Sequence, residues 1–168
     1  STSIYLANDI IKNLPYISVV PWNKIYKRKF LIENNIRFDE SRIHEDIPFT
    51  FKALLSANRV TIVSEKLYNY RHNRSDSVMN NIEDEKLFSI FNVLENTNIV
   101  LNEELSNELI KNSYNLFVIR QLINSTNSTL LNSKIEKQKK YKFLEMVYEI
   151  FETLKIPQDL SFRYSLQM

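Results

Sequence analysis

The amino-acid sequence predicts an α+β protein that is predominantly helical, with short strands in its first part and a helical bundle in its second. Short runs of β-branched and aromatic residues occur before residue 83, whereas apolar residues recur at helical spacing after it. Of the 168 residues, 43% are hydrophobic and 25% are charged, which is typical of a globular protein. The length suffices for one hydrophobic core with a helical appendage.

The first part is predicted to alternate helices with short extended segments. The spacing of Ile4, Leu6, Ile10, Ile11 and Leu14 predicts a helix that ends before Pro15, and residues 17–22 are predicted to be extended. A second helix is predicted from an Asn23 cap to an Asn34-Asn35 turn.

The motif Glu45-Asp46-Ile47-Pro48 predicts the start of a third helix, because acidic residues and proline are favoured in a first turn. This helix should reach about residue 57 and bury Phe49, Ala53 and Leu54. Residues 59–63 and 67–71 are predicted to be extended, with Tyr68 and Tyr70 on one face, and residues 73–80 form a polar loop.

The second part is predicted to be a bundle of two or three helices. Polar breaks over 96–102 and 124–133 should separate them. The apolar residues at helical spacing are Leu87, Ile90, Phe91 and Leu94, then Leu105, Leu109, Leu116, Ile119 and Ile123, then Leu144, Val147, Phe151 and Leu154.

Composition excludes several classes of site. The sequence contains no cysteine, so disulfides, thiolate metal sites and cysteine nucleophiles are absent. It also contains no glycine, which excludes the glycine-rich loops that bind nucleotide phosphates. A net charge of +2 and the lack of a continuous basic helix face argue against a nucleic-acid partner. A hydrolase would need a nucleophile, a base and an orienting group together, and no such set is evident.

Three motifs occur in order between Pro21 and Val78. They are P-W-N-K-I-Y-K-R-K-F, then R-F-D-E-S-R-I-H-E-D-I-P-F-T, then L-Y-N-Y-R-H-N-R-S-D-S-V. In this order and spacing they resemble the second half of bacterial family 2 glycosyltransferases of the GT-A type, over roughly residues 15–80. The resemblance implies a partial GT-A acceptor-side subdomain over residues 1–82, followed by a C-terminal helical extension over residues 83–168.

The resemblance implies a catalytic role for the acidic pair. Inverting glycosyl transfer needs a carboxylate that accepts the proton of the attacking acceptor hydroxyl. Asp46 is the candidate base and Glu45 its neighbour. The same pair is also what a helix N-terminus prefers for capping and dipole reasons, and the two roles are compatible. His44 is interpreted as a neighbouring pocket or core residue.

The resemblance also implies substrate-binding residues on both sides of this pair. Arg71, Arg74 and Ser77 would contact donor diphosphate or acceptor, although Asp76 places a negative charge beside them; a solvated polar loop is the alternative. Trp22 and Lys24 would lie near the acceptor cleft, with Lys24 positioning a phosphate or the segment that carries Asp46. From the residues alone, a buried Trp22 beside a helix cap is favoured.

The sequence lacks two features that the family requires. A series of strands that binds the nucleotide does not precede Pro15, and no D-x-D motif is present to hold a divalent metal, Mg or Mn. We therefore expect a fragment of a transferase that moves a sugar from a nucleotide sugar to a saccharide or lipid-linked acceptor in cell-surface polysaccharide synthesis. The isolated chain should be inactive and should hold no metal or other cofactor.

The remaining expectations concern partners and location. The family implies a cytoplasmic protein at the inner face of the plasma membrane, where a basic cluster could contact anionic lipids; a solvated helix face is the alternative. An apolar patch in the first 80 residues could also support a homodimer. The competing hypothesis is a non-enzymatic helical interaction or regulatory module. An excess of exposed apolar residues after Glu83 would favour it. The basic cluster comprises Lys134, Lys137, Lys139, Lys140 and Lys142.

Overall fold

The structure is a computed structural model that describes residues 3–38, 43–71 and 84–154. It is predominantly helical and contains a small sheet, which confirms the predicted fold class. Along the chain the elements are β1 (Ser3–Leu6), α1 (Ala7–Asn13), the 3₁₀ turns η1 (Leu14–Tyr16) and η2 (Pro21–Asn23), α2 (Arg28–Glu33), α3 (Asp46–Ser56), β2 (Arg59–Ile62), α4 (Asp84–Val100), the 3₁₀ turn η4 (Glu104–Ser106), α5 (Glu108–Leu131) and α6 (Lys137–Thr153).

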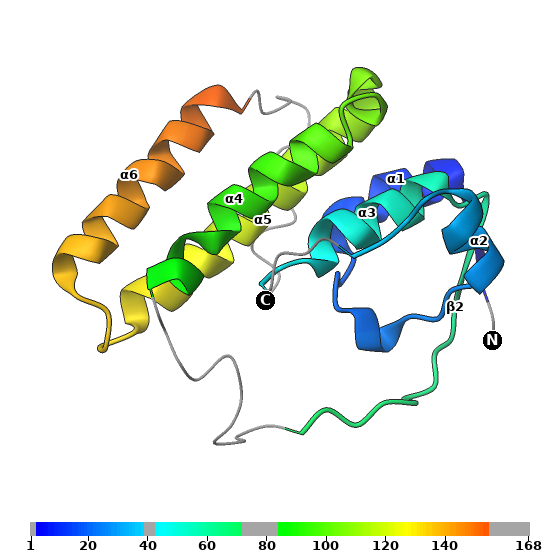
Figure 1. The fold of residues 1–168 in the computed structure, drawn as a ribbon, viewed down its shortest axis with the longest axis horizontal. Coiled ribbons are helices and arrows are strands. Elements are labelled where there is room, and N and C mark those ends of the chain that lie inside the picture. The colour runs from blue at the N-terminus through cyan, green and yellow to red at the C-terminus, as the bar shows by residue number, and fades with distance from the viewer. Residues whose placement is uncertain (1–2, 39–42, 72–83, 155–168) are drawn as a thin grey trace.

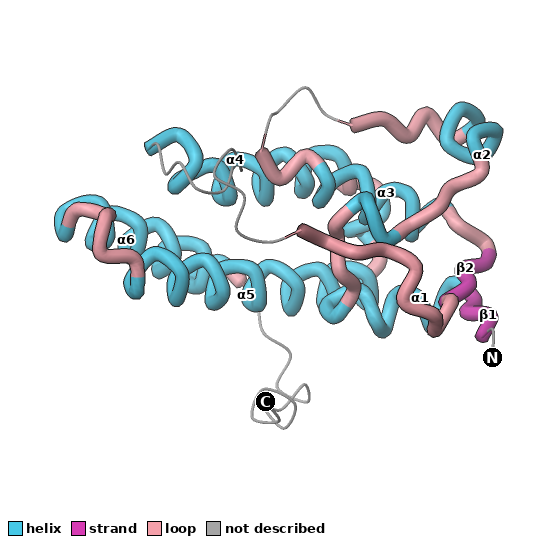
Figure 2. The backbone as a smooth tube through the Cα atoms, turned by 90° about the horizontal axis from the view of Figure 1, so that it is seen from below, coloured by secondary structure: helices cyan, strands magenta, loops and turns pink. Residues whose placement is uncertain are grey.

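The long helices α4, α5 and α6 form a bundle, and the shorter elements pack against one side of it (Figure 1). Helix α5 contacts both α4 and α6, and it also contacts α1 and η1. Helix α3 contacts α1 and α4. Seen from the perpendicular direction, the two strands lie at the end of the molecule that is remote from α6 (Figure 2). The bundle therefore supports α1 and α3, and these carry the sheet.

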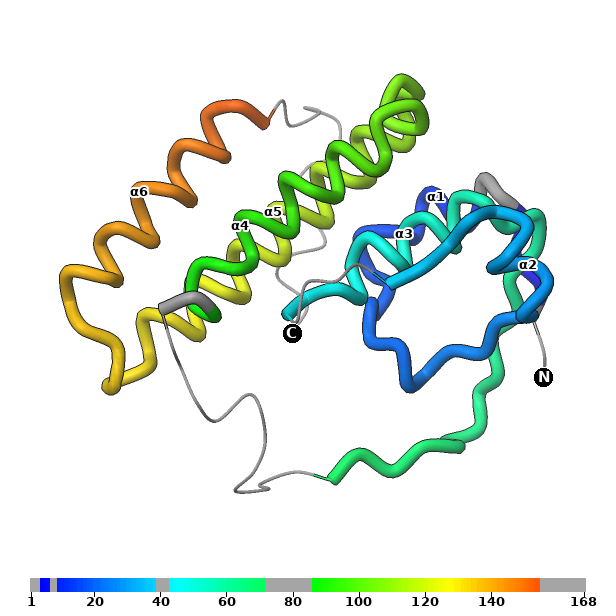
Figure 3. Tube along the Cα trace, in the orientation of Figure 1, coloured from blue at the N-terminus to red at the C-terminus, as the bar shows by residue number. Residues whose placement is uncertain are grey.

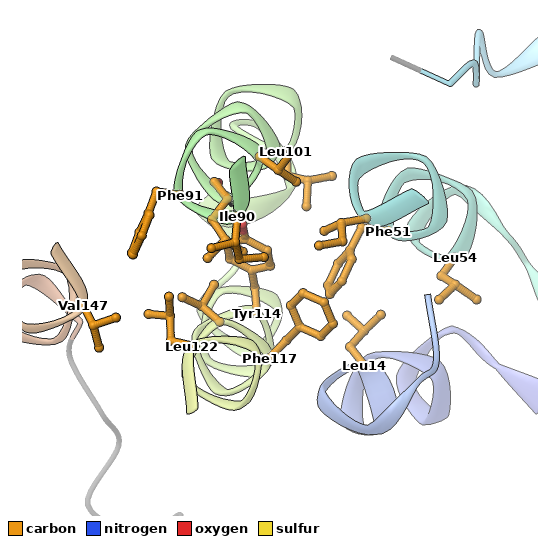
Figure 4. Close-up of a cluster of buried hydrophobic side chains, with 14 of the residues drawn as sticks. Leu14, Phe51, Leu54, Ile90, Phe91, Leu101, Tyr114, Phe117, Leu122 and Val147 are labelled. Carbon is orange, nitrogen blue, oxygen red and sulfur yellow. Dashed lines mark hydrogen bonds between the residues drawn. The ribbon is translucent and has the colours of Figure 1, made fainter. Parts of the chain in front are cut away.

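The main hydrophobic core joins the two parts of the chain. Phe51 of α3 points at α5 and packs edge-on against Tyr114 (5.3 Å between ring centroids) and Phe117 (4.6 Å), with Leu14 beside them (Figure 4). Val147 of α6 closes the opposite side of the same cluster. The predicted division near residue 82 remains a prediction, and this core draws on both sides of it.

Helix α3 also contributes to a second, smaller cluster on its other side. Phe49 and Ala53 pack with Ile36, and Phe38 stacks on Phe49 with 3.9 Å between the ring centroids. The residues predicted to be buried in this helix, including Leu54, are buried, so that prediction is confirmed. A helix that is packed on two sides holds its first turn in a fixed position.

The sheet corrects one helix boundary. Ile4 and Leu6 were expected in a helix but lie in β1, which pairs antiparallel with β2 so that Tyr5 faces Val60. Strand β2 confirms the extended character predicted for residues 59–63. The pairing partner is distant in sequence, so the local spacing could not reveal the strand. Both Ile4 and Leu6 are exposed on its outer face.

The segment around Trp22 differs in part from its prediction. Residues 17–20 form no strand, although Ile17 has extended backbone angles, and Pro21 begins the turn η2. Helix α2 begins at Arg28 rather than after an Asn23 cap, because Lys24 bonds back to Ser18, Val20 and Asn23 and closes the loop before the helix. The predicted turn after α2 is confirmed, because Asn35 adopts a left-handed φ of 49°.

The polar segments of the second part are more helical than predicted. Helix α4 continues to Val100 and α5 to Leu131, so most of both expected breaks is helical. Tertiary packing explains this, because Thr97 and Thr129 are buried and the Thr97 hydroxyl donates to the Val93 carbonyl (2.7 Å). Among the described helices, none combines the length and apolar composition that crossing a lipid bilayer requires.

Candidate functional site

The acidic pair lies at the N-terminus of α3, as predicted. Glu45 precedes the helix and Asp46 is its first residue, and the Glu45 side chain makes no capping hydrogen bond. His44 adopts a left-handed φ of 63°, and its carbonyl accepts a hydrogen bond from the Ile47 N–H (3.0 Å). A non-glycine residue in this conformation is uncommon and occurs preferentially at functional sites. The turn at His44 directs the chain into α3 and fixes where Asp46 begins.

The surroundings of Asp46 favour its protonated form. Partial burial raises the pKa of its carboxyl most, and the neighbouring negative charge of Glu45 raises it further. The backbone N–H groups of Asp46 and Ile47 and the cation of Lys24 oppose this shift, but the net direction is upward. A carboxylate with a raised pKa holds an abstracted proton more readily than an exposed one. Asp46 is thus suited to act as a proton acceptor.

Lys24 lies close to Asp46 but is occupied by the loop that precedes it. Its Nζ donates to the carbonyls of Ser18 and Val20 (2.9 Å for Val20) and to Oδ1 of Asn23 (2.7 Å). Burial lowers the pKa of Lys24, and the negative charge of Asp46 partly restores it. An ammonium group has three N–H donors, and these contacts use all of them. Lys24 therefore organises its own loop over residues 18–23, and both of its predicted roles, toward a phosphate and toward the segment that carries Asp46, stay predictions.

Thr50 is a positioning residue that sequence reasoning missed. It is fully buried on α3, one turn after Asp46, and its hydroxyl donates to the Val19 carbonyl (2.9 Å). Together with Lys24 it fixes the carbonyls of residues 18–20 against the start of α3. A threonine between Phe49 and Phe51 was the available signal, because a polar group in an apolar stretch needs a partner when it is buried.

Trp22 is not the buried residue that the sequence alone favoured. Its side chain is 42% exposed and stacks on Tyr68 (4.8 Å between ring centroids, 20° between planes) and on Tyr70 (5.3 Å, 27°). Figure 3 shows the loop before α2 and the segment after β2 on the same side of the molecule. The two tyrosines share a face as predicted, although residues 67–71 form no strand.

The other predicted site residues are placed only in part. Arg71 is exposed directly after Tyr70. Arg74 and Ser77 lie outside the described residues. Within residues 3–38, 43–71 and 84–154, no group of three His, Asp or Glu side chains is arranged to hold a metal ion. Among the described site residues, Glu45 and Lys24 act electrostatically on Asp46, and Trp22 and Arg71 are exposed.

Several lysines of the basic cluster make contacts within their own helical region. Lys140 donates to the Leu130 carbonyl (2.7 Å), Lys137 lies over the ring of Tyr141 and Lys142 over that of Phe88. Three of the five lysines in the cluster therefore have contacts within the protein.

A concavity lies in the helical region, away from the acidic pair. It has a volume of about 350 Å³ between α4, α5 and α6, and all of its lining residues come from these helices and Leu154. Its walls are apolar at Phe91, Val118 and Met146 and acidic at Glu95 and Glu149. None of the predicted site residues lines it.

Comparison with known proteins gives partial similarities. A segment covering 68% of the chain is 30% identical to the poly(ribitol-phosphate) beta-N-acetylglucosaminyltransferase TarS of Staphylococcus aureus, over 20% of that protein. A segment covering 31% of the chain is 42% identical to the uncharacterized glycosyltransferase EpsJ of Bacillus subtilis, over 15% of that protein. No family model and no solved structure matches the chain.

The chain thus spans at most a fifth of the length of these relatives. Both carry glycosyltransferase names, and the fold described above contains an acidic pair with a lysine whose charge acts on it. We conclude that the chain contains a region related to glycosyltransferases.

Proposed function

We propose that this chain is the acceptor-side part of an inverting family 2 glycosyltransferase of the GT-A type, in which Asp46 is the catalytic base. The carboxylate takes the proton of an acceptor hydroxyl, whose oxygen attacks the anomeric carbon of a nucleotide sugar. The bond from that carbon to the donor phosphate breaks, and its electron pair leaves with the nucleotide diphosphate. The partial similarity to glycosyltransferases supports the reaction class.

The observation that carries this proposal is the raised pKa of Asp46 at a rigid position. An ordinary helix-capping carboxylate is exposed and stabilised by its backbone partners, whereas burial and Glu45 outweigh those partners here. The fold maintains this unfavourable arrangement by packing α3 on two sides. A side chain whose charged form is disfavoured by its surroundings, and which the fold nevertheless holds in place, is characteristic of a functional site.

The distribution of exposed apolar side chains favours this proposal over a helical interaction module. Among the described residues, more large hydrophobic side chains are exposed before residue 72 than after residue 83. Ile25 is 98% exposed and Leu67 is 78% exposed, whereas the helical region covers most of its own apolar residues. Exposed apolar surface in the part of the chain that carries Asp46 fits a transferase part that packs against a nucleotide-binding part.

The proposal assigns the donor and its metal to another part of the parent protein. A divalent Mg or Mn would neutralise the leaving diphosphate there, but the described residues of this chain provide no set of ligands for it. Arg71 and the undescribed Arg74 and Ser77 would approach the diphosphate from the acceptor side. The parent would act on a saccharide or lipid-linked acceptor at the inner face of the plasma membrane.

The test compares two acidic residues that both lie in the first turn of a helix. Asp46→Asn in the parent protein should lower kcat for sugar transfer by about 10²–10⁴-fold, because it removes the base. Asp9→Asn is the matched control, since Asp9 is exposed in the first turn of α1 and should leave kcat unchanged. Transfer would be measured from a panel of radiolabelled nucleotide sugars that includes UDP-N-acetylglucosamine.

Two results would contradict the proposal. If Asp46→Asn kept activity similar to Asp9→Asn, Asp46 would be a helix-start residue and not a base. If the 168-residue chain alone transferred sugar, the assignment of the donor site to another part of the protein would be wrong.

A further inference from the structure

The concavity between α4, α5 and α6, which we call the helical pocket, has no part in the proposed function. Its volume of about 350 Å³ is within the range of sites that hold small organic ligands. Figure 4 shows the ring of Phe91 between α4 and α6. The apolar residues that line the pocket are Phe91, Leu94, Val118, Met146, Ile150 and Leu154.

One end of the helical pocket is polar and the other is apolar. Helix α5 runs antiparallel to α4 and α6 (Figure 1), so the later residues of α4 and α6 lie beside the earlier residues of α5. The lining residues Asn98, Asn115 and Thr153 therefore lie at one end. Phe91 and Val118 lie toward the other. A ligand that matches both ends has a polar group on an apolar body.

A buried amide at the polar end indicates that the pocket receives a ligand. Asn115 lines the pocket and is only 8% exposed, and among the described residues its side chain has no hydrogen-bond partner. Buried polar groups are nearly always hydrogen-bonded, because an unpaired one destabilises the fold. The Asn115 amide therefore has hydrogen-bonding capacity for a molecule in the pocket.

Two carboxylates determine the charge of that molecule. Glu95 on α4 and Glu149 on α6 both line the pocket and are exposed. Among the described residues no lysine or arginine lines the pocket, and neither glutamate forms an ion pair. The pocket thus carries uncompensated negative charge, although the net charge of the chain is +2. A cation complements this charge, whereas an anion is repelled by it.

We propose that the helical pocket binds a small organic cation that consists of an ammonium group on an apolar body. The ammonium N–H groups can donate to the amide oxygen of Asn115 and to the carboxylates of Glu95 and Glu149. The apolar body lies against Phe91 and Val118, where it is removed from water. This inference goes beyond the proposed function, because the pocket shares no residue with the acidic pair of α3.

Methionine methyl groups provide the probe for this proposal. The sequence has three methionines, of which Met146 lines the pocket, while Met79 and Met168 serve as internal references. Phenethylamine would be titrated into the 168-residue chain labelled with ¹³C at these methyl groups and followed by NMR. We expect only the Met146 signal to shift, saturably, with a dissociation constant on the order of 1–10 mM. Met146→Leu would assign the signal.

Matched ligands and charge variants distinguish recognition of a cation from unspecific apolar binding. Phenethyl alcohol should bind about 3–10-fold more weakly than the amine, and phenylpropionate should bind more weakly still. Glu95→Gln and Glu149→Gln should each weaken amine binding by about 2–5-fold and leave alcohol binding unchanged. Glu136→Gln is the matched control, since Glu136 is exposed at the opposite end of α6 and does not line the pocket.

A variant of the buried amide tests the polar end separately. Asn115→Ala should weaken binding of both the amine and the alcohol by about 3–10-fold, because each ligand donates a hydrogen bond to the amide oxygen. Far-UV circular dichroism would verify that every variant is folded. Unchanged binding of both ligands in Asn115→Ala, or unchanged amine binding in both glutamine variants that line the pocket, would overturn the proposal.

Other occupants of the pocket would be visible in the same spectra. An unshifted Met146 signal, or equal binding of the amine, the alcohol and the carboxylate, would refute a cation site. A Met146 signal that depends on protein concentration alone would assign the pocket to a second copy of the chain. A Met168 signal that moves together with Met146 would assign it to the C-terminal residues, and both results overturn the proposal. All of these outcomes are independent of whether Asp46 is a base.

Discussion

Residues 3–71 and residues 84–154 contribute to one hydrophobic core, but they differ in how many large apolar side chains they expose to solvent. The second region buries aromatic residues such as Phe117 and Phe143 between helices, and its helices α4 and α5 also pack against α3, α1 and η1 of the first region. The first region leaves Trp22, Tyr68 and Tyr70 in solvent and keeps a carboxylate with a raised pKa at the start of a helix. The first region therefore exposes more large apolar side chains than the second.

Helix α3 connects the two regions and explains how both requirements are met. Its residue Phe51 packs into the shared core, while its first turn carries Asp46 and its Thr50 holds the loop of Trp22. A functional site needs support from residues that have no part in the chemistry. The helical region provides this support by packing against the side of α3 that carries Phe51.

The largest effect expected from breaking this connection is that of Phe51→Ala. Phe51 is 1% exposed, and its removal should lower the free energy of unfolding by about 3–5 kcal/mol. Urea unfolding would be followed by circular dichroism for the helices and by Trp22 fluorescence for the site. If the shared core couples the regions, both midpoints fall together, and the equally buried Phe143→Ala on α6 lowers both as well. Separate midpoints would mean that the regions unfold independently.

A smaller effect is expected from the threonine that holds the loop. Thr50→Val leaves the Val19 carbonyl without its partner and should cost about 1–2 kcal/mol. Thr97→Val is the equally buried change in the other region, where the hydroxyl bonds to Val93 of its own helix and to the Tyr114 side chain, and it should cost a similar amount. Only Thr50→Val should alter Trp22 emission in the folded state. Equal emission changes in both variants would show that Thr50 does not position the loop.

The smallest effect expected is a gain of stability at the site itself. The folded-state pKa of Asp46 is raised, so its ionisation costs stability above that pKa and costs none below the unfolded value of 3.8. Asp46→Asn should therefore raise the melting temperature at pH 7, and this gain should disappear as the pH falls below about 3.8. Thermal unfolding followed by circular dichroism across this range would measure it. A variant that is less stable than the natural chain at pH 7 would contradict the assignment of burial and Glu45 as the dominant causes.

The sequence by itself determined the elements whose signals are local. The start of α3 at Asp46 follows from acidic residues and proline in a first turn, and the turn at Asn35 follows from the tolerance of asparagine for left-handed φ. The three long helices follow from their apolar spacing. The fold class could be named from the same signals, whereas the candidate base Asp46 was named from the resemblance to glycosyltransferases.

Only the tertiary structure decided the features that depend on partners distant along the chain. Ile4 lies in a strand because Thr61 is opposite it, and Thr97 remains helical because it is buried. Trp22 stacks on Tyr68 and Tyr70, and Lys24 uses its donors on the loop, for the same reason. Local propensities differ by about 1 kcal/mol or less per residue, so a few long-range contacts outweigh them. That balance brought Tyr68 and Tyr70 onto Trp22, which no local pattern encodes.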